Sequence, residues 1–421
     1  MLAPLAFVGV GMLLRLSFST DIEFKSDERG LFDLAHAVAA GAVWPWIGPG
    51  SSIGAPEPAM TDWILGGLAW LTHPKTPPDL ARDIQVLNIL ALALFAASAF
   101  VFDGERRRAW LWAAALWAAN PNALILERKI WHPSLFPLPM VLFLLAWRGR
   151  KSPLGAFAWG VLGAMLGQIH PTGGYFALAV AAWTFMADRK ALPWLPWLAG
   201  SLLGAAPAVP WLLDLASHAG GHGLTRLRLP ILHYFLRFPT RPFGMGIDFT
   251  LGKAFPDFLA WPKIGTTPTF LMAGLHLLLG VLALWTAARA LSGLYLQGLL
   301  TRRNLLLGRD DDARLINAAL WGLGGIISLM TLGPSDTHPH YLEIVATVMA
   351  LWLARLVLVG DETAKRRRAG LILPALCAGQ LALSAGLLIY IDQRQAIPGD
   401  YGVIWRAQTH LPPAWRTPTG G

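Results

Sequence analysis

The sequence has little charge and almost no cysteine. Charged residues make up 14% of its 421 residues, against about a quarter in soluble domains. The one cysteine, Cys377, excludes an internal disulfide. The sequence also lacks a P-loop, a GxSxG turn, a CxxC pair and an HExxH helix, so it offers no support for ATP-driven transport or zinc proteolysis. The residue alternation of an outer-membrane barrel is missing as well.

Apolar residues make up 55% of the chain and come in blocks of about twenty, the length of a helix that crosses a bilayer. We therefore predict an all-α, polytopic integral membrane protein with about eleven transmembrane helices. We treat the chain as a single domain, 1–421. The first block lacks a basic start and a clear cleavage site, so we interpret it as a retained helix. The predicted spans are 2–19, 83–102, 110–125, 134–147, 155–169, 174–187, 193–212, 269–288, 315–332, 342–359 and 370–391.

Basic residues gather in one set of connecting segments, which the positive-inside rule places in the cytoplasm. This topology explains the net charge of +9, so we expect contact with membrane lipids and no nucleic acid. The basic segments are 106–108, 148–151, 189–190, 289–314 and 365–368. The outer side then holds two long segments, 20–82 and 213–268, and the short loops 127–133 and 333–340.

Four carboxylates open the first outer segment: Asp21, Glu23, Asp27 and Glu28. Two interpretations stay open. Ser26 can cap a surface helix that carries acidic residues in its first turn. Alternatively, one of the carboxylates acts as a general base at the edge of the membrane.

Two outer loops carry further polar candidates. Glycine and proline crowd the stretch 48–58, which predicts an ordered loop around Glu57. Glu57 can be a metal ligand, an acceptor for a sugar hydroxyl, or a solvated charge. The next outer loop contains Arg128, Lys129 and His132. Arginine and lysine suit a phosphate group, although structural pairing is the other interpretation.

Histidines mark two more outer positions. His170 follows the fifth predicted span, while His338, His340 and Tyr341 precede the tenth. Polar groups at membrane depth usually face a cavity, but a histidine at a helix end can also reach the interface. The histidine pair can bind a metal with a nearby carboxylate, or donate hydrogen bonds to a phosphate or sugar.

The order of these parts resembles the membrane glycosyltransferases of the GT-C class over nearly the whole chain. That class includes protein O-mannosyltransferases, grouped in glycosyltransferase family 39, and bacterial transferases that add aminoarabinose or other sugars to lipid A. The matching motifs are Asp27-Glu28 before a surface helix, Gly54-Ala55-Pro56-Glu57-Pro58, Arg128-Lys129-Ile130-Trp131-His132-Pro133-Ser134, Gln168-Ile169-His170-Pro171, His338-Pro339-His340-Tyr341, and Gly399-Asp400-Tyr401-Gly402 with Gln408.

The resemblance implies transfer of a sugar from a polyprenyl-phosphate carrier to a lipid, glycan or protein acceptor on the outer face. The expected catalytic residues are Asp27, which we favour as the base, and Glu28. A direct displacement would invert the anomeric centre. We assign no cofactor and no metal ligand, and a need for a divalent metal stays open. The expected substrate-binding residues are Asp21, Glu57, Arg128, Lys129, His132, His170, His338, His340 and Tyr341.

Composition rich in alanine, glycine, tryptophan and arginine favours a bacterial plasma (inner) membrane, with the site facing the periplasm. Two other functions fit the same features. One is a transporter or flippase for a lipid-linked sugar, although transporters commonly show internal repeats and broken helices at the midplane. The other is a non-catalytic subunit that binds a lipid phosphate and tolerates loss of Asp27 and Glu28.

Overall fold

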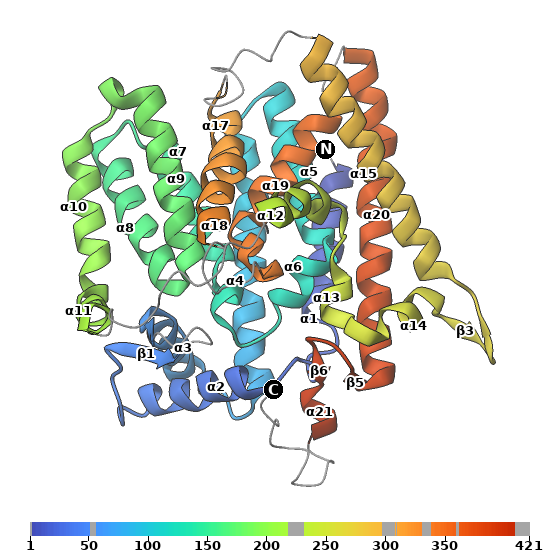
Figure 1. The fold of residues 1–421 in the computed structure, drawn as a ribbon, viewed down its shortest axis with the longest axis horizontal. Coiled ribbons are helices and arrows are strands. Elements are labelled where there is room, and N and C mark those ends of the chain that lie inside the picture. The colour runs from blue at the N-terminus through green and yellow to red at the C-terminus, as the bar shows by residue number, and fades with distance from the viewer. Residues whose placement is uncertain are drawn as a thin grey trace.

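The computed structural model describes residues 2–50, 56–217, 231–296, 308, 310–330, 338–358 and 362–408. These residues are mostly helical (Figure 1). The α-helices are α1 (Leu2–Leu16), α2 (Ser26–Ala39), α3 (Met60–Thr72), α4 (Pro77–Ser98), α5 (Gly104–Ala119), α6 (Pro121–Leu126), α7 (Pro137–Arg148), α8 (Pro153–Ile169), α9 (Pro171–Asp188), α10 (Trp194–Ala205), α11 (Val209–Ser217), α12 (Ile231–Thr240), α13 (Ile247–Leu251), α14 (Phe255–Ala260), α15 (Leu271–Leu296), α17 (Asp311–Asn317), α18 (Gly324–Met330), α19 (Ala346–Val357), α20 (Glu362–Arg394) and α21 (Trp405–Gln408).

Short elements join these helices. A π-helical stretch, η7 (Ala318–Leu323), lies between α17 and α18. The 3-10 helices are η1 (Ala99–Val101), η2 (His132–Leu135), η3 (Arg189–Ala191), η4 (Ala206–Ala208), η5 (Arg241–Phe243), η6 (Gly252–Ala254) and η8 (Pro339–Val345). Antiparallel ribbons pair β1 (Ile47–Gly50) with β2 (Pro56–Pro58), β3 (Lys263–Ile264) with β4 (Thr267–Pro268), and β5 (Ala396–Ile397) with β6 (Gly402–Val403). An isolated bridge joins Glu23 to Ile404.

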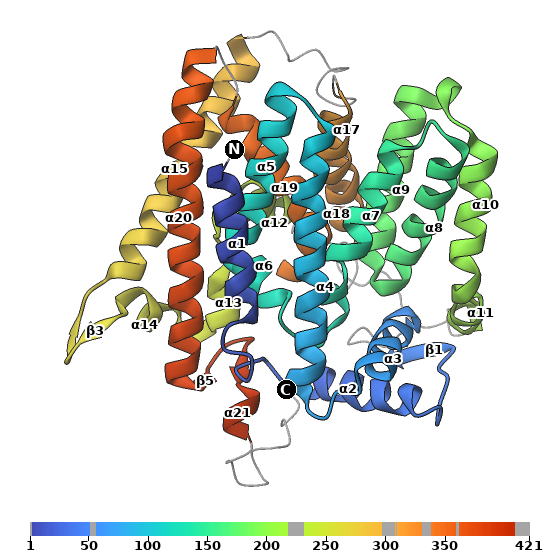
Figure 2. The same ribbon diagram turned by 180° about the vertical axis from the view of Figure 1, so that it is seen from behind.

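Helix α5 forms the centre of the bundle. Every residue from Ala109 to Ala119 is buried, as expected for a helix that is apolar on all sides. Helices α1, α4, α19 and α20 pack around it (Figure 2). Asn120 then caps α6, because its Oδ1 accepts the N–H of Asn122 at 3.0 Å. The predicted span 110–125 is therefore divided between two helices.

Each predicted apolar segment falls on helical structure within its described residues, but the number of about eleven spans is not confirmed. In the part of the chain that the structure describes, four helical segments are long and apolar enough to cross a membrane. Other apolar helices are shorter, and several begin at a proline, which starts a new helix and divides an apolar stretch. The four long segments are Pro77–Val101, Trp194–Leu215, Pro339–Val357 and Gly370–Arg394.

Helices α1 and α5 come close together at Gly11. A methyl group added at Gly11 would overlap the carbonyl group of Ala118, whereas nothing lies within 4 Å of the same position at Gly9. We expect Gly11→Ala to lower the free energy of unfolding by about 1–3 kcal/mol. Gly9→Ala should not lower it, because alanine is the better helix former. Equilibrium unfolding of both variants in detergent measures this, and equal stabilities would contradict the close packing.

Ion pairs connect the helices at the end of the bundle far from α2. Arg106 contacts Asp312 at 2.6 Å, and Arg150 contacts Asp188 at 2.6 Å and Asp311 at 2.8 Å. These arginines belong to the segments that the positive-inside rule places in the cytoplasm. Acidic residues at the start of α17 therefore offset part of the basic charge that we attributed to topology alone.

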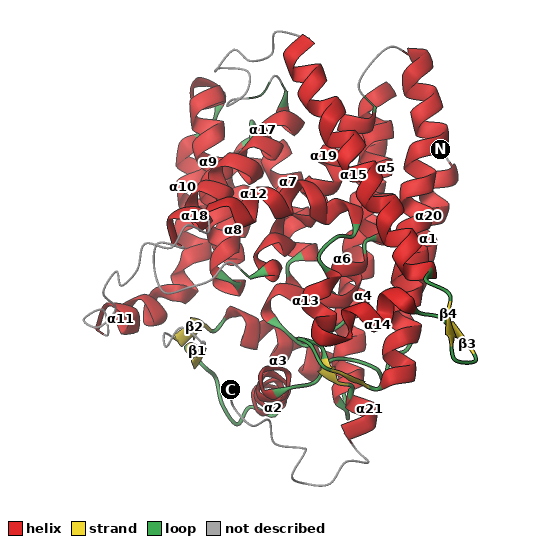
Figure 3. Ribbon diagram, turned by 45° about the vertical axis from the view of Figure 1, so that its right-hand side comes forward, coloured by secondary structure: helices red, strands yellow, loops and turns green. Residues whose placement is uncertain are grey.

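Helix α2 lies across the other end of the bundle and packs on α3 (Figures 1 and 3). It buries Leu31, Ala35 and Val38 against its neighbours. The predicted cap by Ser26 is wrong, because Ser26 is already the first helical residue. Instead, the N–H of Lys25 donates to Oε2 of Glu28 at 2.9 Å. This contact turns the Glu28 side chain back toward the segment that precedes the helix.

Candidate functional site

Two acidic residues near the start of α2 meet a buried lysine from the 127–133 loop. Nζ of Lys129 lies 3.0 Å from Oε2 of Glu23 and 3.5 Å from Oε1 of Glu28. The Lys129 side chain is 4% exposed, and the two carboxylates are 2% and 1% exposed. Burial opposes the charged form of Lys129, but the two carboxylates outweigh it and raise the pKa of the ammonium. Lys129 is therefore a fixed cation at neutral pH.

A row of rings extends from Lys129 into the site. Nζ of Lys129 lies 3.9 Å from the ring centroid of Trp131, a cation–π contact. The rings of Trp131 and His340 are 4.5 Å apart, and His340 in turn lies 5.6 Å from His170. Tyr341 also lies 5.6 Å from His170. The structure thus brings together side chains from the 127–133 loop, from the α8–α9 junction and from η8.

His338 and His340 stack on each other at the beginning of η8. Their ring centroids are 5.4 Å apart and the rings are nearly parallel, at 9°. His338 is exposed, whereas His340 is partly buried beside Trp131. The pair therefore connects the surface with the row of rings. Residues 333–337 of the same predicted loop lie outside the described residues.

A second polar group contains Glu57, His132 and Asp62. Nε2 of His132 lies 2.7 Å from Oε2 of Glu57 on β2. Burial alone would raise the pKa of Glu57, but its contact with His132 lowers the pKa below the ordinary value. Asp62, in the first turn of α3, is 1% exposed, and neither of its carboxylate oxygens has a hydrogen-bond partner among the described residues. Residues 51–55, which complete the loop before Glu57, lie outside the described part.

His170 borders both groups and caps α9. Its Nδ1 lies 2.9 Å from the hydroxyl of Thr172, which follows in the first turn of that helix. Burial lowers the pKa of His170 to about 4, and nearby Glu57 offsets this only in part. At neutral pH the ring is therefore uncharged, and one ring nitrogen acts as an acceptor.

The buried Asp62 gives folding a specific pH dependence. Burial raises the pKa of Asp62 from 3.8 to about 7, with an opposing effect from His132 and a supporting one from Glu57. The protonated form therefore stabilises the folded state at low pH, and this contribution is lost as the pH rises through about 7. We expect Asp62→Asn to raise the melting temperature more at pH about 8 than at pH about 4. An equal change at both values would contradict this.

We call Lys129 with its two carboxylates, the row of rings and the Glu57–His132–Asp62 group the cluster. The remaining predicted residues lie around it. Asp27 is exposed at the start of α2, and its Oδ1 accepts a hydrogen bond from the hydroxyl of Ser26 at 3.4 Å. Asp21 is buried and lies 3.0 Å from Nε of Arg406. Arg128 is also buried, and its guanidinium donates to the carbonyl of Phe18 at 2.9 Å, beyond the end of α1. Asp21 and Arg128 thus hold the first outer segment in place.

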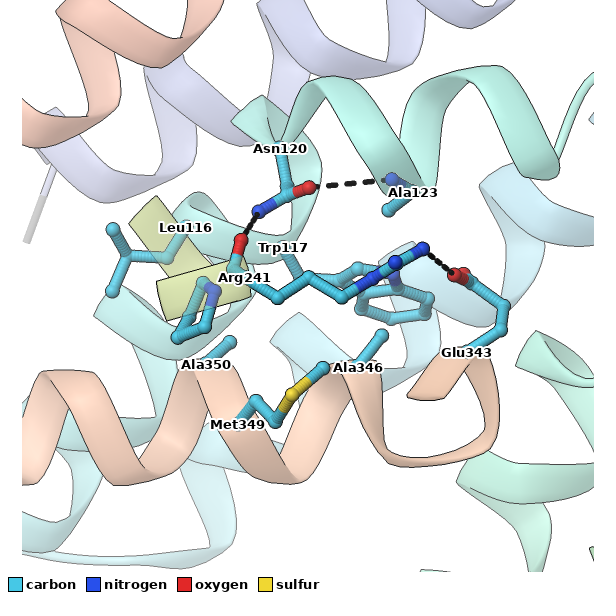
Figure 4. A pocket seen from close by; sticks show the side chains of 10 residues that line it. Leu116, Trp117, Asn120, Ala123, Arg241, Glu343, Ala346, Met349 and Ala350 are labelled. Carbon is cyan, nitrogen blue, oxygen red and sulfur yellow. Dashed lines mark hydrogen bonds and ion pairs between the residues drawn. The ribbon is translucent and has the colours of Figure 1, made fainter. Parts of the chain in front are cut away.

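Buried ion pairs lie next to the segments that carry the cluster. Nε of Arg15 donates to Oε2 of Glu127 at 2.7 Å. In a second buried pair, Nη2 of Arg241 lies 3.7 Å from Oε2 of Glu343 (Figure 4). A cavity of about 10 Å³ beside this second pair has roughly the space that one water needs. Because Glu127 precedes Arg128 and Glu343 follows Tyr341, these pairs position the two segments that carry the rings.

Many members of the cluster follow from the sequence pattern, but two features do not. Glu23 was one of four undistinguished acids, and its pairing with Lys129 depends on an approach between segments more than a hundred residues apart. Asp62 was not considered. The available signal was its position as the one charged residue in the apolar stretch of α3, since acidic groups in such stretches are costly and often functional. Within the described residues, no group of three or more His, Cys, Asp or Glu side chains can hold a metal ion.

No protein-family model matches this chain, and no curated protein matches its sequence. Among solved structures, it is similar to the oligosaccharyltransferase of Archaeoglobus fulgidus tethered through a disulfide bond to an acceptor peptide with an NVT sequon. The TM-score is 0.48 and the sequences are 15% identical. The similarity covers 90% of this chain and 54% of that one, so this chain spans about half the length of that protein. This degree of similarity does not assign the chain to the oligosaccharyltransferases.

Proposed function

We propose that this protein is a membrane glycosyltransferase of the GT-C type. It moves a sugar from a polyprenyl-phosphate carrier to a lipid, glycan or protein acceptor at the end of the bundle covered by α2. In a bacterial cell this end would face the periplasm. The observation that supports the proposal most is the buried Lys129, held as a cation beside carboxylates, tryptophan and histidines near the ends of apolar helices.

The donor chemistry explains why a buried cation is needed. A sugar linked to a polyprenyl phosphate already has a leaving group, and negative charge develops on the phosphate as the glycosidic bond breaks. A preorganised cation in a site with little water stabilises that charge strongly. Lys129 fits this role, with His340 nearby as a hydrogen-bonding group.

The acceptor needs a carboxylate that can take its proton. Glu23 and Glu28 are occupied by Lys129. Asp27 is exposed and forms no ion pair within the described residues, so its carboxylate is accessible to an acceptor hydroxyl. We propose Asp27 as the general base and Glu28 as the residue that holds Lys129 and the turn before α2. Direct attack by the activated hydroxyl inverts the anomeric centre.

The other predicted residues would bind the substrates. Glu57 and His132 form one contacting pair, and the rings of His340 and Tyr341 each lie 5.6 Å from the ring of His170. Neutral imidazoles and a carboxylate are suited to the hydroxyl groups of a sugar. His338 would contact the part of the substrate nearest the surface.

Transfer by the purified protein in detergent tests the proposal. The donors are a panel of polyprenyl-phosphate sugars, the acceptor is a membrane lipid extract, and each reaction is run with and without a chelator. We expect transfer by the wild type and a loss of at least about a hundredfold in Asp27→Asn. Asp33→Asn is the matched control, because Asp33 is exposed on the same helix.

The outcomes separate the alternatives. Transfer that survives Asp27→Asn would exclude Asp27 as the base and direct attention to Asp62 and Glu57. If no donor supports transfer but reconstituted vesicles move the lipid-linked sugar across the bilayer, the protein is a transporter. A lipid phosphate that binds equally well without Asp27 and Glu28, with no transfer, would indicate a non-catalytic subunit.

A further inference from the structure

An open cavity of about 740 Å³ lies outside the cluster described above. It is bounded by the segment after α1, the turn between α3 and α4, and the start of α21. We call it the outer cavity. Its volume falls within the range of about 300–1,000 Å³ that is typical of small-ligand sites. Its lining includes Ser19, Thr20, His73, Lys75, Arg82 and Trp405.

Each of the two carboxylates in the lining accepts hydrogen bonds from the protein through its Oδ2 atom. Asp79 accepts the N–H and the hydroxyl of Thr76, both at 2.8 Å, and the N–H of Lys75 at 3.1 Å. Asp83 accepts the hydroxyl of Thr72 at 2.6 Å. Both acids therefore serve as local acceptors that hold the turn before α4.

The two cations in the lining form no ion pair with a carboxylate in the described part of the chain. These cations, Lys75 and Arg82, are both exposed to the cavity. Ser19 and Thr20 add hydroxyl groups to the lining, and the Trp405 ring adds an apolar surface. An arginine, a lysine and hydroxyl donors together form a set that suits phosphate oxygens.

The backbone at the rim adopts an uncommon conformation. His73, which follows the last residue of α3, has a φ of 52°, and Phe18, just before Ser19, has a φ of 51°. Non-glycine residues in this left-handed region are uncommon and cost free energy, and they concentrate at binding sites. A glycine at position 73 would end the helix at a lower cost. Two such residues thus flank the same cavity.

The outer cavity adjoins the proposed catalytic cluster through one stretch of chain. Thr20 lines the cavity, and its carbonyl accepts the N–H of Arg406 at 3.2 Å. The carbonyl of Ile22 accepts the N–H of Trp405 at 3.0 Å. Glu23 follows directly and contacts Lys129. A ligand in the cavity would therefore lie against the segment that leads into the cluster.

We infer that the outer cavity binds the phosphate group of a phosphorylated glycan, with Lys75 and Arg82 as its charged contacts. The further role of this glycan as the acceptor of the transferred sugar rests on the proposed function. Phospholipid headgroups have the same phosphate chemistry, and cations near the end of a spanning helix often contact them. The experiment must therefore distinguish the two sources of phosphate.

Binding to the full chain in uncharged detergent tests the inference without requiring catalysis. Glucose 6-phosphate is the probe, glucose is its neutral counterpart, and isothermal titration measures affinity. We expect the wild type to bind glucose 6-phosphate at least about tenfold more tightly than glucose. Lys75→Gln/Arg82→Gln should remove that preference at an unchanged melting temperature. Lys253→Gln, which removes an exposed lysine away from the cavity, should keep it.

Two results would overturn the inference. One is a wild type that binds glucose 6-phosphate no better than glucose, and the other is a double variant that binds like the wild type. Titration in phosphatidylcholine nanodiscs with and without phosphatidylglycerol identifies the source of phosphate. If phosphatidylglycerol abolishes binding of glucose 6-phosphate, the cavity is a headgroup site and the glycan role is wrong. If binding is confirmed but no donor supports transfer, only the proposed function fails.

Discussion

Replacing Glu127 by alanine is expected to lower the free energy of unfolding by about 3–5 kcal/mol, because it leaves a buried charge without its partner. Nε of Arg15 and Oε2 of Glu127 are 2.7 Å apart, and both side chains are fully buried. Oε1 of Glu127 also accepts the indole N–H of Trp117 at 2.7 Å. The loss therefore removes an ion pair and a hydrogen bond in the centre of the bundle. Equilibrium unfolding in mixed detergent micelles measures the change.

Two comparisons make this prediction specific. Arg15→Met/Glu127→Leu removes both charges and should be markedly more stable than Glu127→Ala, since an apolar pair can replace a buried ion pair at little cost. Asp103→Ala breaks an exposed pair with Arg107 and should leave unfolding unchanged. A Glu127→Ala protein as stable as the Asp103→Ala protein would show that Arg15 does not depend on Glu127.

Lys129→Met is expected to reduce sugar transfer by about a hundredfold to a thousandfold, the usual cost of removing a preorganised electrostatic contact to a developing charge. The same change leaves Glu28 buried without its cation, while Glu23 keeps only its contact with Lys25 at 2.5 Å. It therefore also destabilises the fold. Initial rates with the best donor from the panel measure the first effect, and the melting temperature measures the second.

A compensated variant separates the two effects of Lys129. Glu23→Gln/Lys129→Met removes one buried charge of each sign and should recover much of the lost melting temperature. It should not recover transfer, because the phosphate still lacks its cation. Lys253→Met serves as the control for loss of a lysine outside the site. If the compensated variant transfers sugar like the wild type, Lys129 is a structural residue and the charge stabilisation lies elsewhere.

The sequence predicted the helical segments well because apolar blocks are a local signal. The block around α4 and the block around α20 appear in the structure as long apolar helices. The length of other helices was harder to predict. Asn120 and the proline after it interrupt one predicted span, and this local capping preference competes with hydropathy averaged over a window. The number of membrane spans therefore does not follow from hydropathy alone.

The sequence indicated which residues belong to the candidate site, but it did not indicate which of them contact each other. Glu57, Lys129, His132, His170 and His340 were chosen by residue type and loop position, and the structure brings them into one cluster.

By itself, the sequence determined the helical, membrane-type character of the chain and the loops that hold its polar residues, because both depend on neighbours within one helix length. Only the tertiary structure decided that Glu23 and Glu28 share Lys129, that Asp62 is buried beside Glu57, and that Asp27 stays exposed. Burial and ion pairing depend on distances between segments far apart in the chain. Those distances come from the packing of whole helices, which no local pattern records.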